Sequence, residues 1–159
     1  MARCRHAGLE AFSDIAQGGE MVATHNISLS TSGNGDIKDI TPAVARELRE
    51  SGLRGGTVTI FCPSATSALT TIEFEDGCVQ DLQRLLDEII PPDQHYAHNA
   101  RWGDGNGHSH VRAALMGPSL TVPFTDGQLT LGTWQQIIFV DFDNRARERT
   151  LIVQIMGDR

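Results

Sequence analysis

The sequence predicts an α+β fold built on antiparallel sheets, with two main helices. About eight short segments alternate between apolar and polar residues and follow one another mostly in hairpin order, and two longer segments repeat apolar residues at helical spacing. The chain has 159 residues, of which 40% are hydrophobic and 21% charged. This length and composition fit one globular domain.

Clear start and stop signals delimit the first elements. Residues 21–30 alternate with a period of two and predict a strand. Pro42 is favoured in the first turn of a helix and Gly52 just after its end, so a helix is expected over 42–51. Residues 57–61 are rich in β-branched side chains and predict a second strand.

The middle of the chain contains the clearest helix. Residues 69–75 alternate as a strand and place Glu73 and Glu75 on its polar face. Residues 79–90 then repeat apolar side chains at helical spacing, and Pro91 stops the repeat. A second helix is therefore expected over this stretch.

The last third begins with a polar, Gly-rich segment over residues 93–107. It has no periodicity and predicts a long loop, of the kind that is either functional or mobile. Turn residues punctuate the remaining sequence. Five further strands are expected, over residues 108–116, 119–124, 128–131, 134–142 and 149–156.

Residues 1–20 show neither strand alternation nor the apolar stretch of a signal peptide. We expect them to be an extension of a single domain over 21–159; the alternative is a short N-terminal helix docked on that domain. No apolar run approaches the length of a membrane span. The three cysteines form no C-x-x-C pair, and this usage favours a reducing cytoplasm.

The chain carries 13 basic and 20 acidic residues, a net charge of −7. This balance argues against a general electrostatic attraction to nucleic acid or to an anionic membrane. It does not exclude a local site for a phosphorylated small molecule.

Histidines crowd around the predicted loop. On the predicted strand 108–116, the side chains of His108, His110 and Arg112 would project from one face. His98 on the loop would complete a three-histidine metal site with an open coordination position, and Arg112 beside it would suit a phosphate. The alternative is a pair of exposed strand histidines that binds nothing.

Carboxylates and arginines offer further candidates. Glu73 could ligate the metal or act as a general base, or could lie on a solvated strand face. Asp81 lies early in the predicted helix, where a catalytic role competes with stabilisation of the helix dipole. Asp104 opens a run like a calcium loop that lacks the later acidic ligands. Three alternating arginines could hold a phosphate, bridge subunits or protect an edge strand from pairing: Arg145, Arg147 and Arg149.

Several short motifs together resemble the YjbQ-like family of small proteins. They are Gly35-Asp36-Ile37, Leu69-Thr70 with Glu73, Tyr96-Ala97-His98, Ser109-His110, Gly117-Pro118-Ser119-Leu120, Pro123 and Leu131-Gly132-Thr133-Trp134-Gln135. The last motif, combined with the upstream histidines, is the most specific. The resemblance covers residues 21–157.

The resemblance implies an α+β fold with an antiparallel β-sandwich-like core, a homotrimer, and a pocket of histidines and carboxylates near subunit contacts. By position it assigns His98, His110, Glu73 and Asp81 to that pocket, and Trp134 and Gln135 to substrate binding. Many relatives carry a histidine where this chain has Ser64, and some differ at His108. One of three imidazoles would therefore come from a different strand.

Members of this family are commonly labelled secondary thiamine-phosphate synthase. We therefore expect an enzyme of that kind, acting on phosphorylated small molecules at a histidine-lined pocket with a divalent metal. Histidines suit zinc or another transition metal better than Mg²⁺, which prefers oxygen ligands. Two alternatives stay open: a non-catalytic metal-binding or metabolite-binding trimer, and a metal-dependent phosphoester hydrolase.

Overall fold

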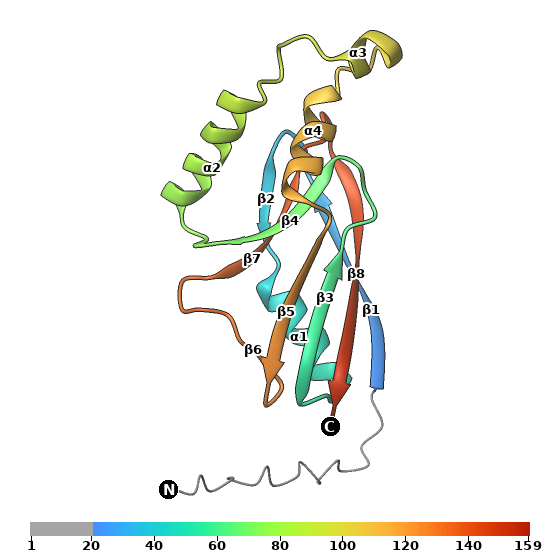
Figure 1. Cartoon of the computed structure of the whole chain (residues 1–159), viewed down its shortest axis with the longest axis vertical. Coiled ribbons are helices and arrows are strands. Elements are labelled where there is room, and N and C mark those ends of the chain that lie inside the picture. Colours follow the sequence, from blue (N-terminus) through green and yellow to red (C-terminus); the bar gives the residue numbers. More distant parts are fainter. Residues whose placement is uncertain (1–20) are drawn as a thin grey trace, which may run out of the picture.

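Two antiparallel sheets form the framework of the protein in the computed structural model, which describes residues 21–159 (Figure 1). The expectations for residues 1–20 lie outside the described part. The larger sheet has five strands in the order β1 (Met21–Thr31), β8 (Arg147–Asp158), β3 (Gly55–Phe61), β5 (Ser119–Thr125) and β6 (Gln128–Leu129). The smaller sheet has the order β2 (Asp36–Asp39), β7 (Gln136–Asp141) and β4 (Ser67–Ile72).

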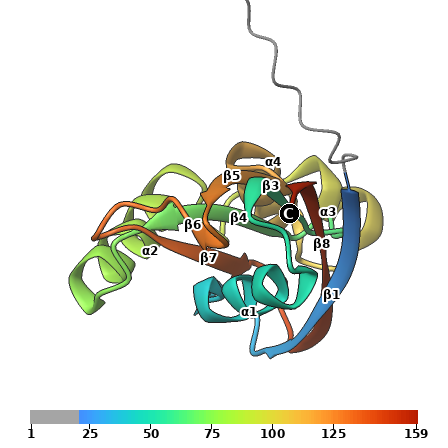
Figure 2. The same cartoon turned by 90° about the horizontal axis from the view of Figure 1, so that it is seen from below.

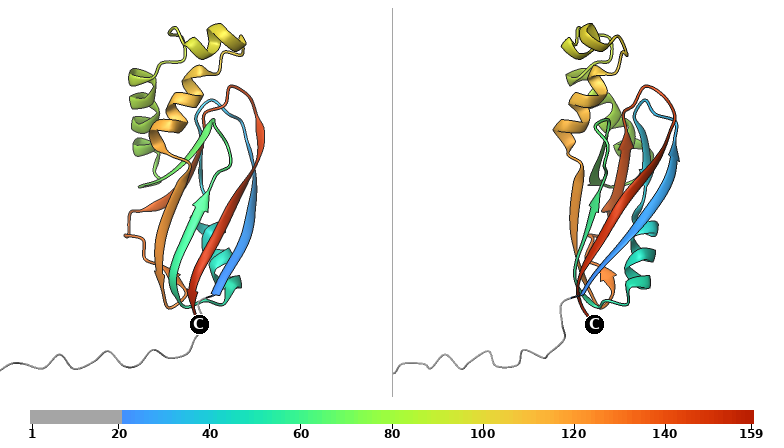
Figure 3. Two further views of the ribbon diagram at one scale, coloured as in Figure 1. Left: turned by 45° about the vertical axis from the view of Figure 1, so that its right-hand side comes forward. Right: turned by 90° about the vertical axis from the view of Figure 1, so that its right-hand side faces the viewer.

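Four helices accompany the sheets. They are α1 (Thr41–Ser51), α2 (Asp76–Ile89), α3 (Ala97–Trp102) and α4 (Gly107–Met116). The last three gather at the end of the sheets opposite the C-terminus (Figures 1 and 3). Helix α1 lies near the other end, where it contacts β1, β7 and β8 (Figure 2). None of the helices within residues 21–159 is long and apolar enough to cross a bilayer.

Strand β7 separates two apolar cores because both of its faces are buried. Ile137 and Phe139 pack into the larger core with α1 and the five-stranded sheet. Ile138 and Val140, which point the other way along the strand, join the smaller core with α2 and α4. The smaller core thus attaches α2 and α4, the helix that carries His108 and His110, to the sandwich.

The sequence predicts the α+β class and most of the elements correctly. The helices expected over 42–51 and 79–90 correspond to α1 and α2. At the end of α1, Gly52 adopts a φ of 70°, the left-handed conformation that favours glycine after a helix. Glu75 caps α2, because its carboxylate accepts hydrogen bonds from the backbone N–H groups of Gly77 and Cys78.

Two expectations about elements were wrong, and one short strand was missed. The expected loop over 93–107 contains α3, and the short strand β2 was not foreseen. The segment 108–116 lies in helix α4 rather than in a strand. This last difference reorganises the predicted site.

Candidate metal centre

Helix α4 shows its helical character in its burial pattern. The buried positions are Gly107, His108, Ser109, Arg112 and Ala113, which follow the spacing of one helix face. The alternation that suggested a strand covers only five residues, and the Ala-Ala-Leu-Met run that follows consists of strong helix formers. The carbonyl of Asn106 accepts hydrogen bonds from the N–H groups of Ser109 and His110 at the start of the helix.

The helix separates side chains that a strand would have placed together. Residues two apart on an α-helix are related by a rotation of about 200° and so point to nearly opposite sides, whereas residues four apart share a face. His108 and Arg112 therefore share the buried face of α4, and His110 points elsewhere. The expected surface of two imidazoles and a guanidinium does not exist.

His98, Asp104 and His110 come together instead. Their possible ligand atoms all lie within 4.8 Å of one another. His98 Nε2 lies 3.1 Å from Asp104 Oδ2, and the ring centroids of His98 and His110 are 4.4 Å apart. Two imidazoles and one carboxylate are a donor set that suits zinc and other divalent transition metals.

The loop between α3 and α4 positions Asp104. Helix α3 ends at Gly103, which has a φ of 68°. The Oδ1 atom of Asp104 accepts a hydrogen bond from the N–H of Asn106 at 3.2 Å, and Asn144 Nδ2 donates to the Asp104 carbonyl at 2.7 Å. The hydrogen bonds from His98 and Asn106 hold the pKa of Asp104 below its usual value. The carboxylate is therefore ionised at neutral pH, as a metal ligand must be.

Two hollows border this group. One has a volume of about 310 Å³ and is lined by His110, Ser64, Ser67 and Pro118 among others. The other has a volume of about 450 Å³ and is lined by Asp104, Asn106, Asn144, Arg145 and Arg147. Ser64, where the family resemblance would expect a histidine, thus lines the same hollow as His110.

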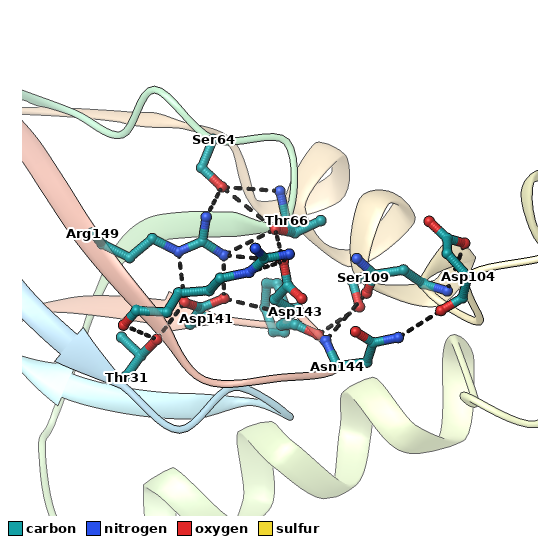
Figure 4. A network of polar contacts seen from close by, with 12 residues as sticks. Thr31, Ser64, Thr66, Asp104, Ser109, Asp141, Asp143, Asn144 and Arg149 are labelled. Atoms are coloured by element: carbon teal, nitrogen blue, oxygen red, sulfur yellow. Dashed lines mark hydrogen bonds and ion pairs between the residues drawn. The ribbon is translucent and has the colours of Figure 1, made fainter. Parts of the chain in front are cut away.

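A buried network of charged side chains lies next to Asn144 and Asp104, two residues that line the second hollow (Figure 4). Asp141 and Asp143 are 0% and 2% exposed. Arg149 donates to both oxygens of Asp141, at 2.7 and 2.8 Å, and to Ser64 and Thr66 at 3.0 Å. Burial opposes ionisation of Asp143, but Arg147 and Thr66 outweigh it and lower the pKa of this carboxyl group.

The three alternating arginines therefore differ in role. Arg149 is bound within the buried network and Arg147 donates to Asp143 at 2.9 Å. Arg145 is exposed and has no ion pair with any of the residues 21–159. It is the arginine that the hollow leaves available to an anion.

His108 and Arg112 do not belong to the group of His98, Asp104 and His110. His108 is 7% exposed and packs against Tyr96, and its Nδ1 atom has no hydrogen-bond partner within the described residues. Burial, with help from the charge of Arg112, lowers the pKa of His108. The guanidinium of Arg112 binds the carbonyl of Ile90 and the carboxylate of Asp87, so it fastens α4 to the end of α2.

The expected carboxylates also lie elsewhere in the subunit. Glu73 is exposed just beyond the end of β4, and Asp81 is exposed on α2, where it accepts a hydrogen bond from Arg84 at 2.8 Å. The cap of α2 is Glu75 and not Asp81. Neither Glu73 nor Asp81 joins the group of His98 and its neighbours.

Trp134 and Gln135 lie near the same end of β4. The indole of Trp134 is 71% exposed, and Gln135 Nε2 donates to Thr71 Oγ1 at 3.0 Å. The side chain of Gln135 also accepts a hydrogen bond from Gly132, which closes the turn before β7. Within one subunit, this motif shapes a turn and presents an exposed aromatic ring.

The sequence did not identify Asp104 as a candidate metal ligand. It indicated only that Asp104 begins an incomplete calcium loop. The available signal was its spacing, since Asp104 lies six residues from both His98 and His110. Reading that signal required knowing that helices flank the loop on both sides.

Comparison with known proteins places the chain among relatives over almost its full described length. The family model described as "UPF0047 protein YjbQ-like" matches residues 25–158. A UPF0047 protein of Methanothermobacter thermautotrophicus is 39% identical over 136 residues, which cover 86% of this chain and 93% of the relative. The UPF0047 protein YugU of Bacillus subtilis is 35% identical over 133 residues, covering 82% and 97%.

Solved structures agree with these matches. A crystal structure of a YjbQ-like protein of unknown function from Sulfolobus solfataricus has a TM-score of 0.84 and 31% identity, covering 88% of this chain and 100% of the other. A family member from Clostridium acetobutylicum has a TM-score of 0.76 and 36% identity, covering 82% and 98%. The chain described here belongs to the YjbQ-like UPF0047 family.

Proposed function

We propose that this protein binds a divalent transition metal, with zinc as the first candidate, at His98, Asp104 and His110, and acts there on a phosphorylated small molecule. One observation carries the proposal: two imidazoles and an ionised carboxylate converge within 4.8 Å beside a hollow lined by Arg145, which has no ion pair within residues 21–159. The metal set replaces the expected His108 by Asp104.

The donor set fits the metal in chemistry and in access. Ligand atoms of one zinc ion lie about 2.0–2.2 Å from it and so must be within about 4.4 Å of each other. The side chains of His98 and Asp104 are 32% and 44% exposed, so they can rotate to close the small remaining gap. Three protein ligands leave a coordination position free, the arrangement typical of a reactive site rather than a structural one.

The neighbouring hollow supports a phosphorylated ligand. Arg145 brings a guanidinium with a geometry that suits phosphate, and the amide groups of Asn106 and Asn144 line the same hollow. Asp104 alone would repel an anion from this hollow, and a bound cation would remove that repulsion. Anion binding should therefore depend on the metal.

The family resemblance suggests the reaction, formation of thiamine phosphate from its two phosphorylated precursors. A bound metal would supply Lewis-acid stabilisation of the charge that develops on a phosphate group. In this chain Arg145 would hold the phosphate, and a metal bound between His98 and Asp104 would replace the hydrogen bond that joins these two side chains in the metal-free protein. Because the family's Glu73, Asp81, Trp134 and Gln135 lie away from the histidines, they would have to act across a contact between subunits.

We accordingly include a cytoplasmic homotrimer in the proposal. Exposed apolar side chains lie near both groups of proposed site residues. Val111 and Leu115 lie on α4, which carries His110, and Phe74 and Trp134 lie near the end of β4, close to Glu73. Joining the two faces would bury these side chains and bring Glu73 towards the histidines of a neighbour. Free Cys62 and Cys78 are compatible with a reducing compartment.

Metal content of the purified protein tests the first part. Dialysis against buffered zinc followed by elemental analysis should give one ion per chain, and His98→Ala and His110→Ala should each weaken binding at least about 100-fold. His95→Ala, an exposed histidine on the same segment, is the matched control and should bind normally. Equal zinc binding in all four proteins would overturn the metal site.

Turnover tests the second part. The zinc-loaded protein should form thiamine phosphate from the two precursors, and a panel of phosphate monoesters distinguishes this reaction from simple hydrolysis. Hydrolysis would replace the synthase by a phosphoesterase, and metal binding without turnover of either kind would favour the non-catalytic binder. If the site spans subunits, mixed trimers of Glu73→Gln and His110→Ala chains should recover part of the activity that each variant lacks alone.

A further inference from the structure

A third hollow lies on the other face of α4, away from His110. It has a volume of about 220 Å³ and is lined by residues of α2, α4 and β7 and of the turn that precedes β2. Polar lining side chains include Asn34, Gln83, Asp87 and Arg112, and the apolar walls come from Leu86 and Phe142 among others. The volume corresponds to about seven water molecules at 30 Å³ each, and so to a molecule of one ring.

Arg112, a buried residue, lines this cavity and keeps one nitrogen without a hydrogen-bond partner among residues 21–159. The residue is 6% exposed, and its Nε and Nη2 atoms donate to the carbonyl of Ile90 at 3.1 and 2.7 Å. Its Nη2 also contacts Asp87 Oδ1 at 2.7 Å. The remaining nitrogen, Nη1, has no hydrogen-bond partner among residues 21–159, yet solvent still reaches it, since it is not one of the fully buried orphan atoms. A guanidinium fixed by three contacts thus keeps one nitrogen free, on a residue that lines the cavity.

The charge of the cavity disfavours an anion. Asp87 neutralises Arg112 at 2.7 Å, and the second oxygen of Asp87 remains as an acceptor on the 64% exposed carboxylate. A phosphate or carboxylate at Nη1 would face that negative charge at close range. A neutral carbonyl oxygen satisfies the donor without this repulsion.

Two side chains with a free acceptor oxygen line the same cavity as Arg112. Gln83 uses its Nε2 atom to donate to the carbonyl of Gly35 at 3.1 Å, which fixes the side chain and leaves Oε1 as an acceptor. Arg112 Nη1 as donor, with Gln83 Oε1 and Asp87 Oδ2 as acceptors, complements a ring that carries a C=O next to an N–H. The apolar walls of Leu86 and Phe142 complement the faces of such a ring.

We infer that this cavity is a binding site for a neutral single-ring cyclic amide, held by Arg112 Nη1 at its carbonyl and by Gln83 or Asp87 at its N–H. The site is independent of the metal proposal, because its residues share no ligand with His98, Asp104 and His110. Loss of zinc binding would leave this inference intact, and the reverse also holds.

Titration of the full chain with uracil, followed by backbone amide NMR shifts, tests the inference. Saturable shifts should map to residues around Gly35, Gln83 and Arg112, whereas benzoate, an anion of similar size, should produce none at this place. Gln83→Leu should weaken uracil binding about tenfold through the loss of one hydrogen-bonding group. Gln80→Leu, a glutamine on the exposed face of the same helix, should leave binding unchanged.

Arg112→Lys adds a second variant that retains the charge but cannot reproduce the fork. Its amide spectrum should remain that of a folded protein while uracil binding falls at least about tenfold. Three results would overturn the inference: no uracil shifts at the cavity, shifts of equal strength in Gln83→Leu, or stronger shifts with benzoate than with uracil.

Discussion

The imidazole of His98 lies 4.4 Å from that of His110, centroid to centroid, although one belongs to α3 and the other to α4. The turn between the two helices brings the rings together and places Asp104 beside them. Two short helices at the end of a β-sandwich thereby create the donor set on which the proposed function depends. The following variants test the parts of that arrangement.

The carboxylate charge of Asp104 should be needed for metal binding and not for folding. Asp104→Asn preserves the size of the side chain and should weaken zinc binding at least about tenfold, while the free energy of unfolding of the metal-free protein changes by less than about 0.5 kcal/mol. Competition with a zinc-binding dye and urea denaturation measure the two effects. Asp93→Asn, an exposed carboxylate on the preceding segment, serves as the control.

Mild acid should not release the metal by protonating Asp104. The pKa of Asp104 is lowered from 3.8 in the metal-free protein by its bonds to His98 and Asn106, so it stays ionised until the pH falls below that ordinary value. Any metal loss over the range from pH 7 to 5 is then a general property of imidazole ligation, because protons compete with the metal for the ring nitrogen. Zinc affinity should fall across this range both in the parent protein and in Asp104→Asn. An affinity that does not change with pH would contradict ligation by imidazole.

Gly107 should be essential to the geometry of the centre. A Cβ atom at this position would lie 2.5 Å from Cβ and 2.8 Å from Cγ of Tyr96, and 2.9 Å from Asn99 Oδ1. Gly107→Ala should therefore push α4 away from α3, costing about 1–3 kcal/mol of stability and weakening zinc binding. Gly132→Ala is a useful contrast, because its added Cβ would meet only Gln135, at ordinary contact distances of 3.7 and 3.8 Å, and the centre is elsewhere. Normal zinc affinity in Gly107→Ala would show that the helix junction does not position the ligands.

His108 should make stability fall on mild acidification. Burial and the nearby Arg112 lower its pKa below 6.5 in the folded protein, whereas the unfolded chain keeps the ordinary value. The contribution of neutral His108 to the free energy of unfolding is present in full above pH 6.5. It is lost as the pH falls from 6.5 towards the lowered pKa, because the unfolded state then binds the proton more readily. Urea unfolding of metal-free protein at pH 7.5 and 5.5 measures the loss. His108→Gln should lose less than the parent, and His95→Gln should lose as much.

Arg149 should be the most costly charge to remove. Asp141 and Asp143 are almost fully buried, and Arg149 supplies both hydrogen bonds that neutralise Asp141. Arg149→Met should destabilise the protein by about 3–5 kcal/mol, as expected when one partner of a buried pair is lost. Arg147→Met, which removes a partly exposed arginine from Asp143 alone, should cost less in the same denaturation experiment. A similar loss of unfolding free energy in both variants would show that Arg149 is no more important to the network than Arg147.

The framework was predictable because its residues repeat over long distances. The alternation of β1 and β8 continues for 11 and 12 residues, and the apolar spacing of α2 runs for four turns before Pro91. Packing reinforces such patterns, since a strand with one buried face must alternate. These elements needed no knowledge of their partners.

The site was less predictable because short segments decide it. Over five residues, His108 to Arg112 alternate as well as a strand, and only the Ala-rich continuation and the packing on Phe142 and Leu86 favour a helix. Strand β2 is too short, at four residues, to show a period. His98 and His110 were identified by the family resemblance and by residue type, whereas Asp104 required the turn between two helices to be known.

Crystals of the zinc-loaded protein, with anomalous diffraction recorded at the zinc absorption edge, test the central claim most directly. The account predicts one peak bonded to an imidazole nitrogen of His98, an imidazole nitrogen of His110 and a carboxylate oxygen of Asp104. A peak held by other residues, such as His25 with Glu47 on β1 and α1, or no peak at this centre at full zinc occupancy in solution, would contradict it.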